Sequence, residues 1–411
     1  MNAPQPIAWK QGSTQHIPNA VYSDPALYEK ELDTFFYGKH WSYVGLECEI
    51  PNVGDFKATQ IGEKPVVLVR NHDMTIHVVE NRCAHKGVKF CQSSHGNTQF
   101  FRCPYHQWNY RLDGTLRGVP FRQGVNGQGG MPKDFKLEEH GLNKLKVAAH
   151  NGAVFASFAH DAPDFSNYLG PLMKGYFERT FDGRTLTLLG YNRQRIAGNW
   201  KLMQENIKDP YHASLLHVFF ITFGLFRADQ KSAIEMDEQG RHAVLVSRRN
   251  AGGENKEVTK DAGSFKDGLK LEDMRVMDVA HEPWWGEPTV VMQTIFPSVI
   301  IQQQINSLST RQIIPVSPGV FDFVWTHFGF DTDDEAMTTR RLRQANLFGP
   351  AGYVSGDDGE VIEFSQQGVS AYPEGECVVK LDGEGTHNTQ HMVTETAIRA
   401  MYKYHRETIS P

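Results

Sequence analysis

Short apolar runs separated by turn residues predict β-strands between Trp41 and Phe158. Turn residues interrupt these runs at three places: Asn71-His72-Asp73, Asp113-Gly114 and Asn151-Gly152. Asp-Gly and Asn-Gly pairs between apolar runs are typical of β-hairpins. An all-β domain is therefore predicted over 41–160. Residues 1–40 are predicted to form an N-terminal arm and a helix, because Asp24-Pro25 is a common N-cap and first-turn pair.

Longer β-patterned runs and helical segments follow one another from Asp161 to the C-terminus. The helical segments are predicted at 165–181, 334–349 and 393–405, and the β runs at 185–196, 242–250, 289–316 and 321–330. Residues 251–272 are polar and contain glycine, which predicts a flexible loop. Consecutive strands without a helix between each pair favour an antiparallel sheet. The predicted fold class is α+β: the all-β domain precedes a second domain, 161–411, with a large antiparallel sheet flanked by helices.

The composition narrows the class of protein. The chain has 411 residues, of which 40% are hydrophobic and 22% are charged, and its net charge is −6. These values predict a globular cytoplasmic protein and argue against a nucleic-acid partner. The N-terminus lacks the basic start and apolar core of a signal peptide. The most apolar run, 218–226, is too short to span a membrane. Five cysteines in so long a chain do not indicate a disulfide framework.

Two of these cysteines are paired with histidines at ligand spacing. Cys83-x-His85 and Cys103-x-x-His106 are separated by seventeen residues. A Rieske [2Fe–2S] centre holds one iron by two thiolates and the other by two imidazoles, so two arms that each supply one Cys and one His match it. The alternative is a structural Cys2His2 zinc site, but such sites more often pair Cys with Cys and His with His. Cys91, between the arms, is interpreted as a packed free thiol.

A second cluster lies in QENIKDPYHASLLH, residues 204–217. Two imidazoles, His212 and His217, with one carboxylate from elsewhere would form the facial triad of non-haem Fe(II) sites. On a straight helix the two side chains would point about 140° apart. Both can reach one metal only if the helix bends, bulges or ends between them, and Asp209-Pro210 is a possible break or new N-cap. The alternative is two packed core histidines.

The chain as a whole resembles the large (α) subunit of Rieske non-haem iron aromatic-ring hydroxylases. The resemblance is carried, in the family order, by CAHKG, CPYHQWNY, GNWK, ENIKDPYHASLLH and GPAGYVSGDDGE. It implies a [2Fe–2S] cluster on Cys83, His85, Cys103 and His106, and a mononuclear Fe(II) that uses O2. Electrons would come from NAD(P)H through a reductase and a ferredoxin. The implied protein is bacterial, with an N-terminal Rieske domain and a C-terminal catalytic domain.

The third ligand of the mononuclear iron is expected between 349 and 366. In the family pattern the second acid of the pair is the ligand, which is Asp358 here, and Asp357 is the alternative. The acids are also compatible with an ordinary helix N-terminus, where they favour the macrodipole. Sequence spacing does not separate these interpretations, because the acids lie far beyond His217.

Asp209 is expected to orient an iron-bound imidazole. It lies three residues before His212, on nearly the same helical face, and a carboxylate there can hold the outer nitrogen of a ligating histidine. The resemblance implies that Asp209 also contacts His106 of a neighbouring subunit, supported by Glu205 and Asn206. It further implies a ring of subunits, either an α3β3 hexamer with a small β subunit or an α3 trimer.

Within the family the general likeness along the chain is greatest to the salicylate 5-hydroxylases, which implies conversion of salicylate to gentisate. The alternatives are dioxygenation of another benzoate, such as anthranilate or terephthalate, and a Rieske electron carrier without catalysis. The His212, His217 and Asp358 set argues against a carrier.

Amide side chains in the β run 300–311 are the candidate substrate contacts. Strand alternation places Gln302, Gln304 and Asn306 on one face, and amides in an apolar strand are unfavourable unless paired. Gln304 is predicted to bind the carboxylate or phenol, with Ser355 facing the same pocket. Arg311 would be either a carboxylate clamp or a structural ion pair. The alternative is that the amides fill a polar sheet edge. HMVTET, near the C-terminus, contains no arginine, which favours a monocarboxylate.

Overall fold

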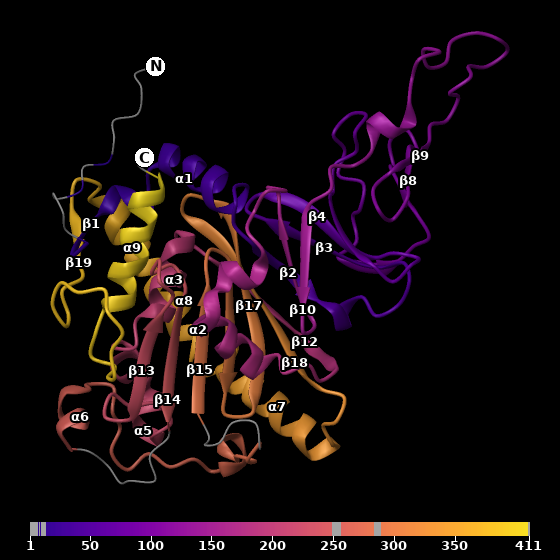
Figure 1. Cartoon of the computed structure of the whole chain (residues 1–411). Helices are drawn as coiled ribbons and strands as arrows, with labels where there is room; N and C mark the ends of the chain where they lie inside the picture. Colours follow the sequence, from indigo (N-terminus) through magenta and orange to yellow (C-terminus); the bar gives the residue numbers. More distant parts are fainter. Residues whose placement is uncertain (1–6, 8, 10–13, 249–255, 283–288, 410–411) are drawn as a thin grey trace. The chain divides into compact units, whose positions relative to one another are not determined.

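The computed structural model describes residues 7, 9, 14–248, 256–282 and 289–409, which form two compact units (Figure 1). One unit comprises residues 35–163, and the other comprises 1–34 together with 164–411.

The unit 35–163 contains three small antiparallel sheets. The first has the strand order β5 (Ile76–Glu80), β4 (Lys64–Arg70), β3 (Asp55–Ile61) and β6 (His95–Asn97). The second has β7 (Phe101–Arg102), β8 (Asn109–Tyr110) and β9 (Leu116–Gly118), and the third has β10 (Lys146–His150), β11 (Ala153–Ser157) and β2 (Ser42–Leu46). The all-β prediction is confirmed.

The three predicted hairpin turns are also confirmed. Strands β4 and β5 pair around residues 71–75, β8 and β9 pair around Gly114, and β10 and β11 pair around Asn151 and Gly152. Asn151 and Gly152 have φ angles of 48° and 92°. Positive φ at both central residues is the requirement of a type I′ hairpin turn, which explains the Asn-Gly pair.

The second unit is built on a seven-stranded antiparallel sheet, as predicted. Its strands follow the order β12 (Leu186–Ile196), β18 (Val320–Phe330), β17 (Ser307–Ser317), β16 (Val299–Gln304), β15 (Thr289–Ile295), β14 (Ala243–Arg248) and β13 (Lys231–Met236). Each neighbouring pair is antiparallel.

The predicted β run 300–311 is interrupted, so one part of its alternation is wrong. Strand β16 ends at Gln304, and Ile305-Asn306 forms the turn to β17, with Ile305 at a φ of 54°. The Asn306 amide bonds to Ala280 and Glu282 outside the sheet. Asn306 therefore does not share a strand face with Gln302 and Gln304.

Helices connect and cover the strands of this unit. They are α1 (Pro25–Glu31), α2 (Phe165–Thr180), α3 (Trp200–Lys208), α4 (Ala213–Leu216), α5 (Val218–Phe223), α6 (Lys256–Asp261), α7 (Glu335–Phe348), α8 (Ser355–Ala371) and α9 (Thr396–Ile409). Asp24 caps α1 by accepting from Leu27 N at 2.8 Å, as predicted.

The prediction of a flexible loop over 251–272 is wrong where α6 forms, and residues 251–255 lie outside the described residues. No helix in the described ranges is long and apolar enough to cross a membrane.

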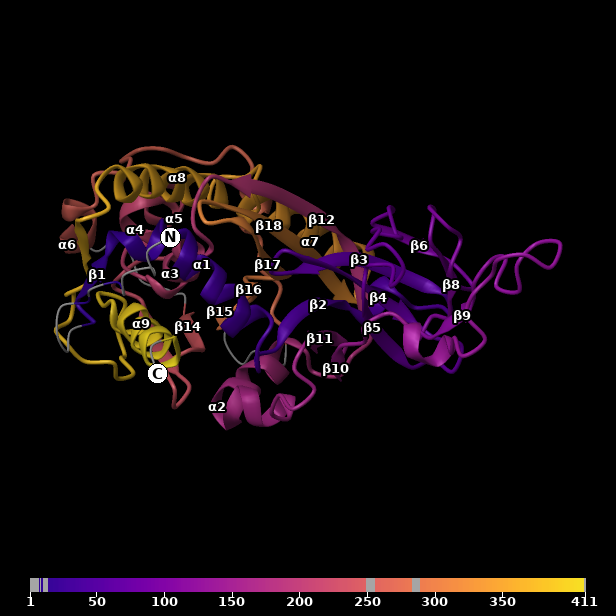
Figure 2. The same ribbon diagram turned by 90° about the horizontal axis from the view of Figure 1, so that it is seen from above.

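Helices cover both faces of the seven-stranded sheet (Figure 2). Lys208 at the end of α3 donates to Thr294 Oγ1 at 2.8 Å. The neighbouring Gln293 donates to the Met173 carbonyl of α2 at 2.6 Å. Adjacent residues of a strand point to opposite faces, so α3 and α2 pack on opposite faces of β15.

Candidate functional site

The two Cys-His arms in the unit 35–163 have the same backbone pattern. Cys83 N–H donates to Val88 O at 2.8 Å and Cys103 N–H donates to Trp108 O at 2.9 Å. Each cysteine carbonyl accepts from the residue four positions later, Gly87 at 2.9 Å and Gln107 at 3.0 Å. These two residues have positive φ angles of 71° and 55°. The arms are thus two matching tight loops, although their sequences differ in the Cys-to-His spacing.

The loops bury the thiols and leave the imidazoles nearer to solvent. Cys83 and Cys103 are each 1% exposed, whereas His85 is half-buried and His106 is exposed. The two imidazole rings lie close together, with centroids 4.6 Å apart. His85 Nδ1 is buried without a hydrogen-bond partner, and burial raises the pKa of the Cys103 thiol. Buried thiols and an unsatisfied imidazole nitrogen fit a bound metal cluster.

The spacing of these four side chains differs from that of a single-metal site. Across the described residues, one group of His, Cys, Asp or Glu side chains brings at least three ligand atoms within 4.8 Å of one another. This group is His212, His217 and Asp358. The four Cys and His side chains of the two loops do not form such a group. Ligands of one tetrahedral zinc would lie that close, since zinc bonds are about 2.0–2.3 Å long. Two arms that each supply one thiolate and one imidazole match the split ligation of a [2Fe–2S] cluster.

Cys91 is a packed thiol, as predicted. It is 7% exposed, and its Sγ donates to the Ser93 carbonyl at 3.4 Å. The Asn81 side chain fixes its backbone, with two hydrogen bonds of 2.8 Å to the N–H and carbonyl of Cys91. The two thiols that the Cys-His loops present are therefore Cys83 and Cys103.

In the second unit, the predicted helix break between the two histidines is confirmed. Helix α3 ends at Lys208, and Asp209 Oδ1 accepts from Tyr211 N at 2.8 Å and His212 N at 3.3 Å. The short helix α4 then ends at Leu216, and His217 directly after it has extended backbone angles of φ −84° and ψ 99°. This break removes the 140° divergence expected on a straight helix and lets both imidazoles face one point.

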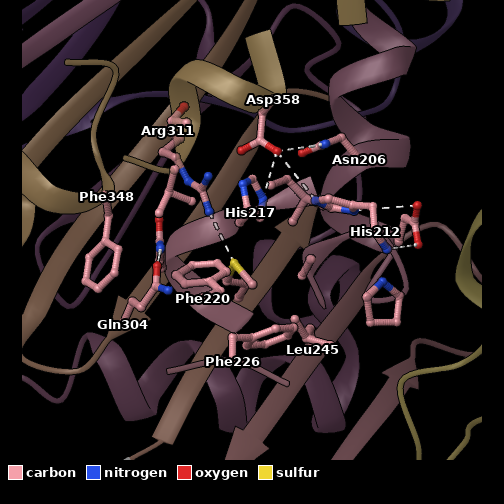
Figure 3. Close-up of a pocket in the computed structure, with 18 of the residues that line it drawn as sticks. Asn206, His212, His217, Phe220, Phe226, Leu245, Gln304, Arg311, Phe348 and Asp358 are labelled. Atoms are coloured by element: carbon pink, nitrogen blue, oxygen red, sulfur yellow. Dashed lines mark hydrogen bonds and ion pairs between the residues drawn. The ribbon is translucent and has the colours of Figure 1, made fainter. Parts of the chain in front are cut away.

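Asp358 lies between the two imidazoles (Figure 3). Its Oδ1 is 3.4 Å from His212 Nε2 and 3.2 Å from His217 Nε2. Asn206 Nδ2 donates to the same oxygen at 3.1 Å. Asp358 is in the first turn of α8 and is 5% exposed. Two imidazole nitrogens from the two ends of α4 and one carboxylate oxygen from the first turn of α8 thus converge, as a facial triad requires.

Two further carboxylates face the outer nitrogens of the imidazoles. Asp209 Oδ2 lies 3.5 Å from His212 Nδ1, and Asp357 Oδ2 lies 3.2 Å from His217 Nδ1. Such contacts orient a ligating histidine and fix its tautomer. The contact of Asp209 was expected from its spacing, whereas the contact of Asp357 was not.

The local electrostatics favour a bound cation. Burial alone would lower the pKa of His212, but hydrogen bonds and charges from Asp209 and Asp358 raise that pKa to about 10. Burial would raise the pKa of Asp358, yet the two imidazoles hold it well below its usual range. Both shifts have the same cause: carboxylates around the imidazoles stabilise positive charge at this point.

Glu205 lies on a different side of α3 from the triad. Its carboxylate accepts hydrogen bonds from the hydroxyls of Tyr402 and Tyr22. Burial raises the pKa of Glu205 to about 7, although both hydroxyls lower it. In the described part of the chain no hydrogen bond joins Glu205 to Asp209. Of the two residues expected to support Asp209, Asn206 contacts the triad and Glu205 does not.

A pocket adjoins the triad, and its empty space, including the part open to solvent, is about 450 Å³. Its apolar wall includes Phe220, Phe226, Leu245, Met292 and Phe348. The sheet contributes a polar floor: Gln302, Gln304, Arg311 and Trp325. Ser355 completes the lining beside Asp358.

The predicted substrate residues all line this cavity. Gln302 Nε2 donates to Gln304 Oε1, and Ser355 donates to Gln194 Oε1 at 3.4 Å. Arg311 is 3% exposed and contacts Met292 Sδ at 3.4 Å. Burial lowers the pKa of Arg311 to about 9, despite the opposing charge of Asp358. Within the described residues no carboxylate forms an ion pair with Arg311, so the structural ion pair left open above is not observed.

Two family models match the chain. Residues 40–128 match the Rieske [2Fe-2S] domain, and residues 179–410 match the catalytic domain of the ring-hydroxylating alpha subunit. The first match contains both Cys-His loops, and the second contains the triad and the cavity. Proteins with this pair of domains carry a Rieske cluster and a mononuclear iron, and they use O2 with electrons from a reductase.

Individual relatives agree with these matches. The chain is 59% identical to the large oxygenase component of salicylate 5-hydroxylase from Ralstonia sp, over 99% of this chain and 97% of that protein. It is 38% identical to the terminal oxygenase component subunit alpha 2 of terephthalate 1,2-dioxygenase from Comamonas sp, over 98% and 97% of the two chains. The solved structure of naphthalene 1,2-dioxygenase shares the fold, with a TM-score of 0.80, 19% identity, and coverage of 97% and 93%. The chain therefore belongs to the ring-hydroxylating Rieske oxygenases, as an α subunit.

Proposed function

We propose that this chain is the terminal oxygenase component of a multicomponent system that hydroxylates salicylate at ring position 5 to give gentisate. The observation that carries the proposal is Arg311, a buried guanidinium that faces the cavity beside the triad and has no carboxylate partner in the described part of the chain. The 59% identity to a salicylate 5-hydroxylase component supports the choice of substrate.

The geometry of the two sites supports one set of ligands for the [2Fe–2S] cluster and another for the mononuclear iron. Cys83, His85, Cys103 and His106 would hold the [2Fe–2S] cluster, and His212, His217 and Asp358 would hold the mononuclear iron. The unsatisfied His85 Nδ1 fits the first assignment, and the converging atoms within 4.8 Å fit the second. His212, His217 and Asp358 would hold an iron that could supply O2 activation, because a facial triad leaves coordination positions open.

Asp358 is a better candidate ligand than Asp357. Its Oδ1 faces the inner nitrogen of both histidines, whereas Asp357 faces the outer nitrogen of His217 alone. The Asp357 side chain is also 42% exposed, compared with 7% for Asp358. Asp357 would therefore orient His217 rather than bind the metal.

The residues that line the cavity would bind and orient the substrate. A buried guanidinium without an anion is unfavourable by several kcal/mol, so an aromatic carboxylate that pairs with Arg311 removes this penalty. Arg311 is the one Arg or Lys among the described residues that line the cavity, which matches one carboxylate rather than two. The aromatic ring would lie against Phe220 and Phe226, which exclude water. Gln304 and Ser355 would contact the polar substituents.

The 2-hydroxyl group of salicylate would face the Gln302–Gln304 pair. Gln302 donates to Gln304, and Gln302 Oε1 is buried without a partner. Because an acceptor that lacks a donor is unfavourable when buried, a phenolic O–H beside it is stabilising. The alternative interpretation, that these amides only fill a polar sheet edge, does not account for their position in the cavity lining.

Electron delivery would use Asp209. Its carboxylate faces His212 Nδ1 at 3.5 Å, and its side chain is 23% exposed. His106 is exposed in its own unit. A partly exposed Asp209 is accessible to His106 of a neighbouring subunit, which would place the cluster of one chain near the iron of the next. An α3 trimer or an α3β3 hexamer with a small β subunit would supply such neighbours. A ferredoxin and its reductase would supply electrons from NAD(P)H, in the bacterial cytoplasm.

Product identification tests this function. The purified α subunit, with any β subunit that its relatives' systems contain, is supplied with a matched reductase, ferredoxin and NAD(P)H. Salicylate, anthranilate, benzoate and terephthalate are compared in parallel. We expect gentisate from salicylate as the main product. Efficient turnover of terephthalate without any gentisate from salicylate would refute the proposal, and turnover of anthranilate alone would favour a dioxygenase of that benzoate.

A further inference from the structure

Trp325 is a cavity residue that the proposed contacts leave without a role. It lies on β18, directly opposite Arg311 of β17 in the antiparallel register. Directly opposed residues project on the same face of a sheet. Both side chains line the cavity beside the triad, and the guanidinium carbon of Arg311 lies 4.6 Å from the centre of the indole ring.

Both side chains present a donor without an acceptor. Trp325 is 1% exposed and Arg311 is 3% exposed. Trp325 Nε1 and Arg311 Nε are both buried without a hydrogen-bond partner in the part of the chain that the structure describes. A buried tryptophan N–H usually finds a partner, and leaving it unpaired costs about 1–3 kcal/mol. Two such donors side by side in one cavity indicate that a ligand supplies the acceptors.

The indole is held firmly in this orientation. His327 lies against it with ring centroids 5.8 Å apart and an angle of 25° between the rings, and Phe323 makes an edge contact at 5.5 Å. His327 Nε2 is in turn hydrogen-bonded to Asn192 Oδ1 at 2.8 Å. Ring packing on both sides fixes the direction of the N–H before any ligand binds, which reduces the entropy lost on binding.

We infer that the indole N–H of Trp325 is the second donor of the substrate-carboxylate site, alongside the guanidinium of Arg311. The inference rests on the proposed function, because it concerns the same substrate. A carboxylate has two oxygens and accepts only, which matches two donors without an acceptor between them. One oxygen would accept from Arg311 and the other from Trp325. Trp325 thereby determines specificity for an anionic ring over a neutral one.

The test is Trp325→Phe, which keeps an aromatic ring beside Arg311 and His327 and removes the indole N–H. Binding of salicylate and of phenol, which lacks the carboxylate, is measured by titration calorimetry on the iron-loaded protein. We expect the Kd for salicylate to rise about tenfold and that for phenol to change less than about twofold. In turnover, KM for salicylate should rise by the same factor while kcat is retained. An unchanged salicylate Kd, or equal changes for both ligands, would overturn the inference.

Trp41→Phe is the matched control. Trp41 is also 1% exposed, and its indole N–H donates to the Pro163 carbonyl at 2.9 Å within the unit 35–163. The control should leave both dissociation constants unchanged. If the wild-type protein forms no gentisate, the proposed function fails. The inference is then decided by the benzoate that the wild-type protein does bind: equal affinities of wild type and Trp325→Phe for it would overturn the inference, and a weaker one for the variant would support it.

Discussion

His217 is held between two neighbouring carboxylates: its Nδ1 lies 3.2 Å from Asp357 Oδ2, and its Nε2 lies 3.2 Å from Asp358 Oδ1. Both acids are in the first turn of α8. Consecutive helical residues point about 100° apart, so one backbone segment places a carboxylate at each nitrogen of the same ring. Under the proposed function, Asp357 would orient the imidazole and Asp358 would bind the metal.

The isosteric variants Asp358→Asn and Asp357→Asn should separate these tasks. Asp358→Asn removes the carboxylate charge that faces both inner nitrogens, and we expect loss of the mononuclear iron and of turnover. Asp357→Asn removes an orienting contact, and we expect iron affinity or activity to fall about 10–100-fold while iron still binds at saturation. Metal analysis after gel filtration measures both. The assignment is reversed if Asp357→Asn is the variant that loses its iron.

Variants in the two units should affect different metals. Cys83→Ser or His106→Ala should abolish the visible absorbance and the EPR signal of the Rieske cluster. His212→Ala should leave both signals intact and abolish turnover, because the two sites are in separate units. The wild-type protein should contain about three irons per chain. Two irons would indicate an electron carrier, and a colourless zinc protein would exclude a Rieske cluster. Wild-type activity in His212→Ala would place the mononuclear site elsewhere.

Local spacing in the sequence was sufficient to find most of the residues that now lie together. The Cys-His pairs in each loop are two or three residues apart, so a tight turn brings them together. Asp209-Pro210 signalled the end of α3 just before His212, because an Asp side chain can cap the following turn, but the second break, at His217, carried no local signal. The short strands and their hairpins were likewise marked by Asn-Gly and Asp-Gly pairs.

Contacts set by tertiary packing could not be found in this way. The proximity of Trp325 to Arg311 depends on the register of β17 against β18, and no local pattern specifies that register. The turn at Ile305 was missed because a β-branched residue rarely adopts a positive φ angle. The contact between Asp357 and His217 spans 140 residues. The resemblance implied that Glu205 supports Asp209, but the Glu205 carboxylate is bonded to Tyr402 instead.

Asp209→Asn should interrupt electron transfer while both metal sites remain occupied. The amide keeps the shape of the side chain, so the cap of the following turn is largely preserved, but its charge beside His212 Nδ1 is lost. We expect a cluster that can still be reduced, and a rate of cluster oxidation by substrate and O2 that falls about 10–100-fold. Single-turnover absorbance measurements provide this rate. A near-normal rate would leave Asp209 with the capping role alone.

Glu205 should make stability depend on pH. Burial raises the pKa of its carboxyl to about 7, compared with about 4.3 in an unfolded chain. Between these values the folded state binds more protons than the unfolded state, so the contribution of Glu205 to stability is fully present below about pH 4 and is lost as the pH rises through 7. The loss is at most about 4 kcal/mol, and the partial exposure of Glu205 makes it smaller.

Glu205→Gln cannot ionise and should not show this loss. We expect the melting temperature of the variant to rise relative to the wild type by a few degrees between pH 5 and pH 8. Thermal unfolding at four pH values across this range measures the difference. Glu29→Gln, a change at an exposed position of α1, is the control. A difference between Glu205→Gln and the wild type that stays constant with pH would contradict the assigned shift.

Gln304→Leu should weaken salicylate binding without affecting the metals. Leucine removes the acceptor for Gln302 Nε2, so the Gln302 amide loses its orientation in the cavity floor and the phenolic hydroxyl loses its partner. We expect KM for salicylate to rise tenfold or more, on the order of 1.4 kcal/mol, with the iron content and the Rieske signals unchanged. Gln303→Leu is a matched control on the same strand, because the Gln303 side chain points to the opposite face and donates to the Ile305 carbonyl at 3.0 Å. Benzoate, which lacks the 2-hydroxyl, should show a smaller change in KM than salicylate in Gln304→Leu. An equal change for both substrates would assign the amide pair to packing instead of hydroxyl recognition.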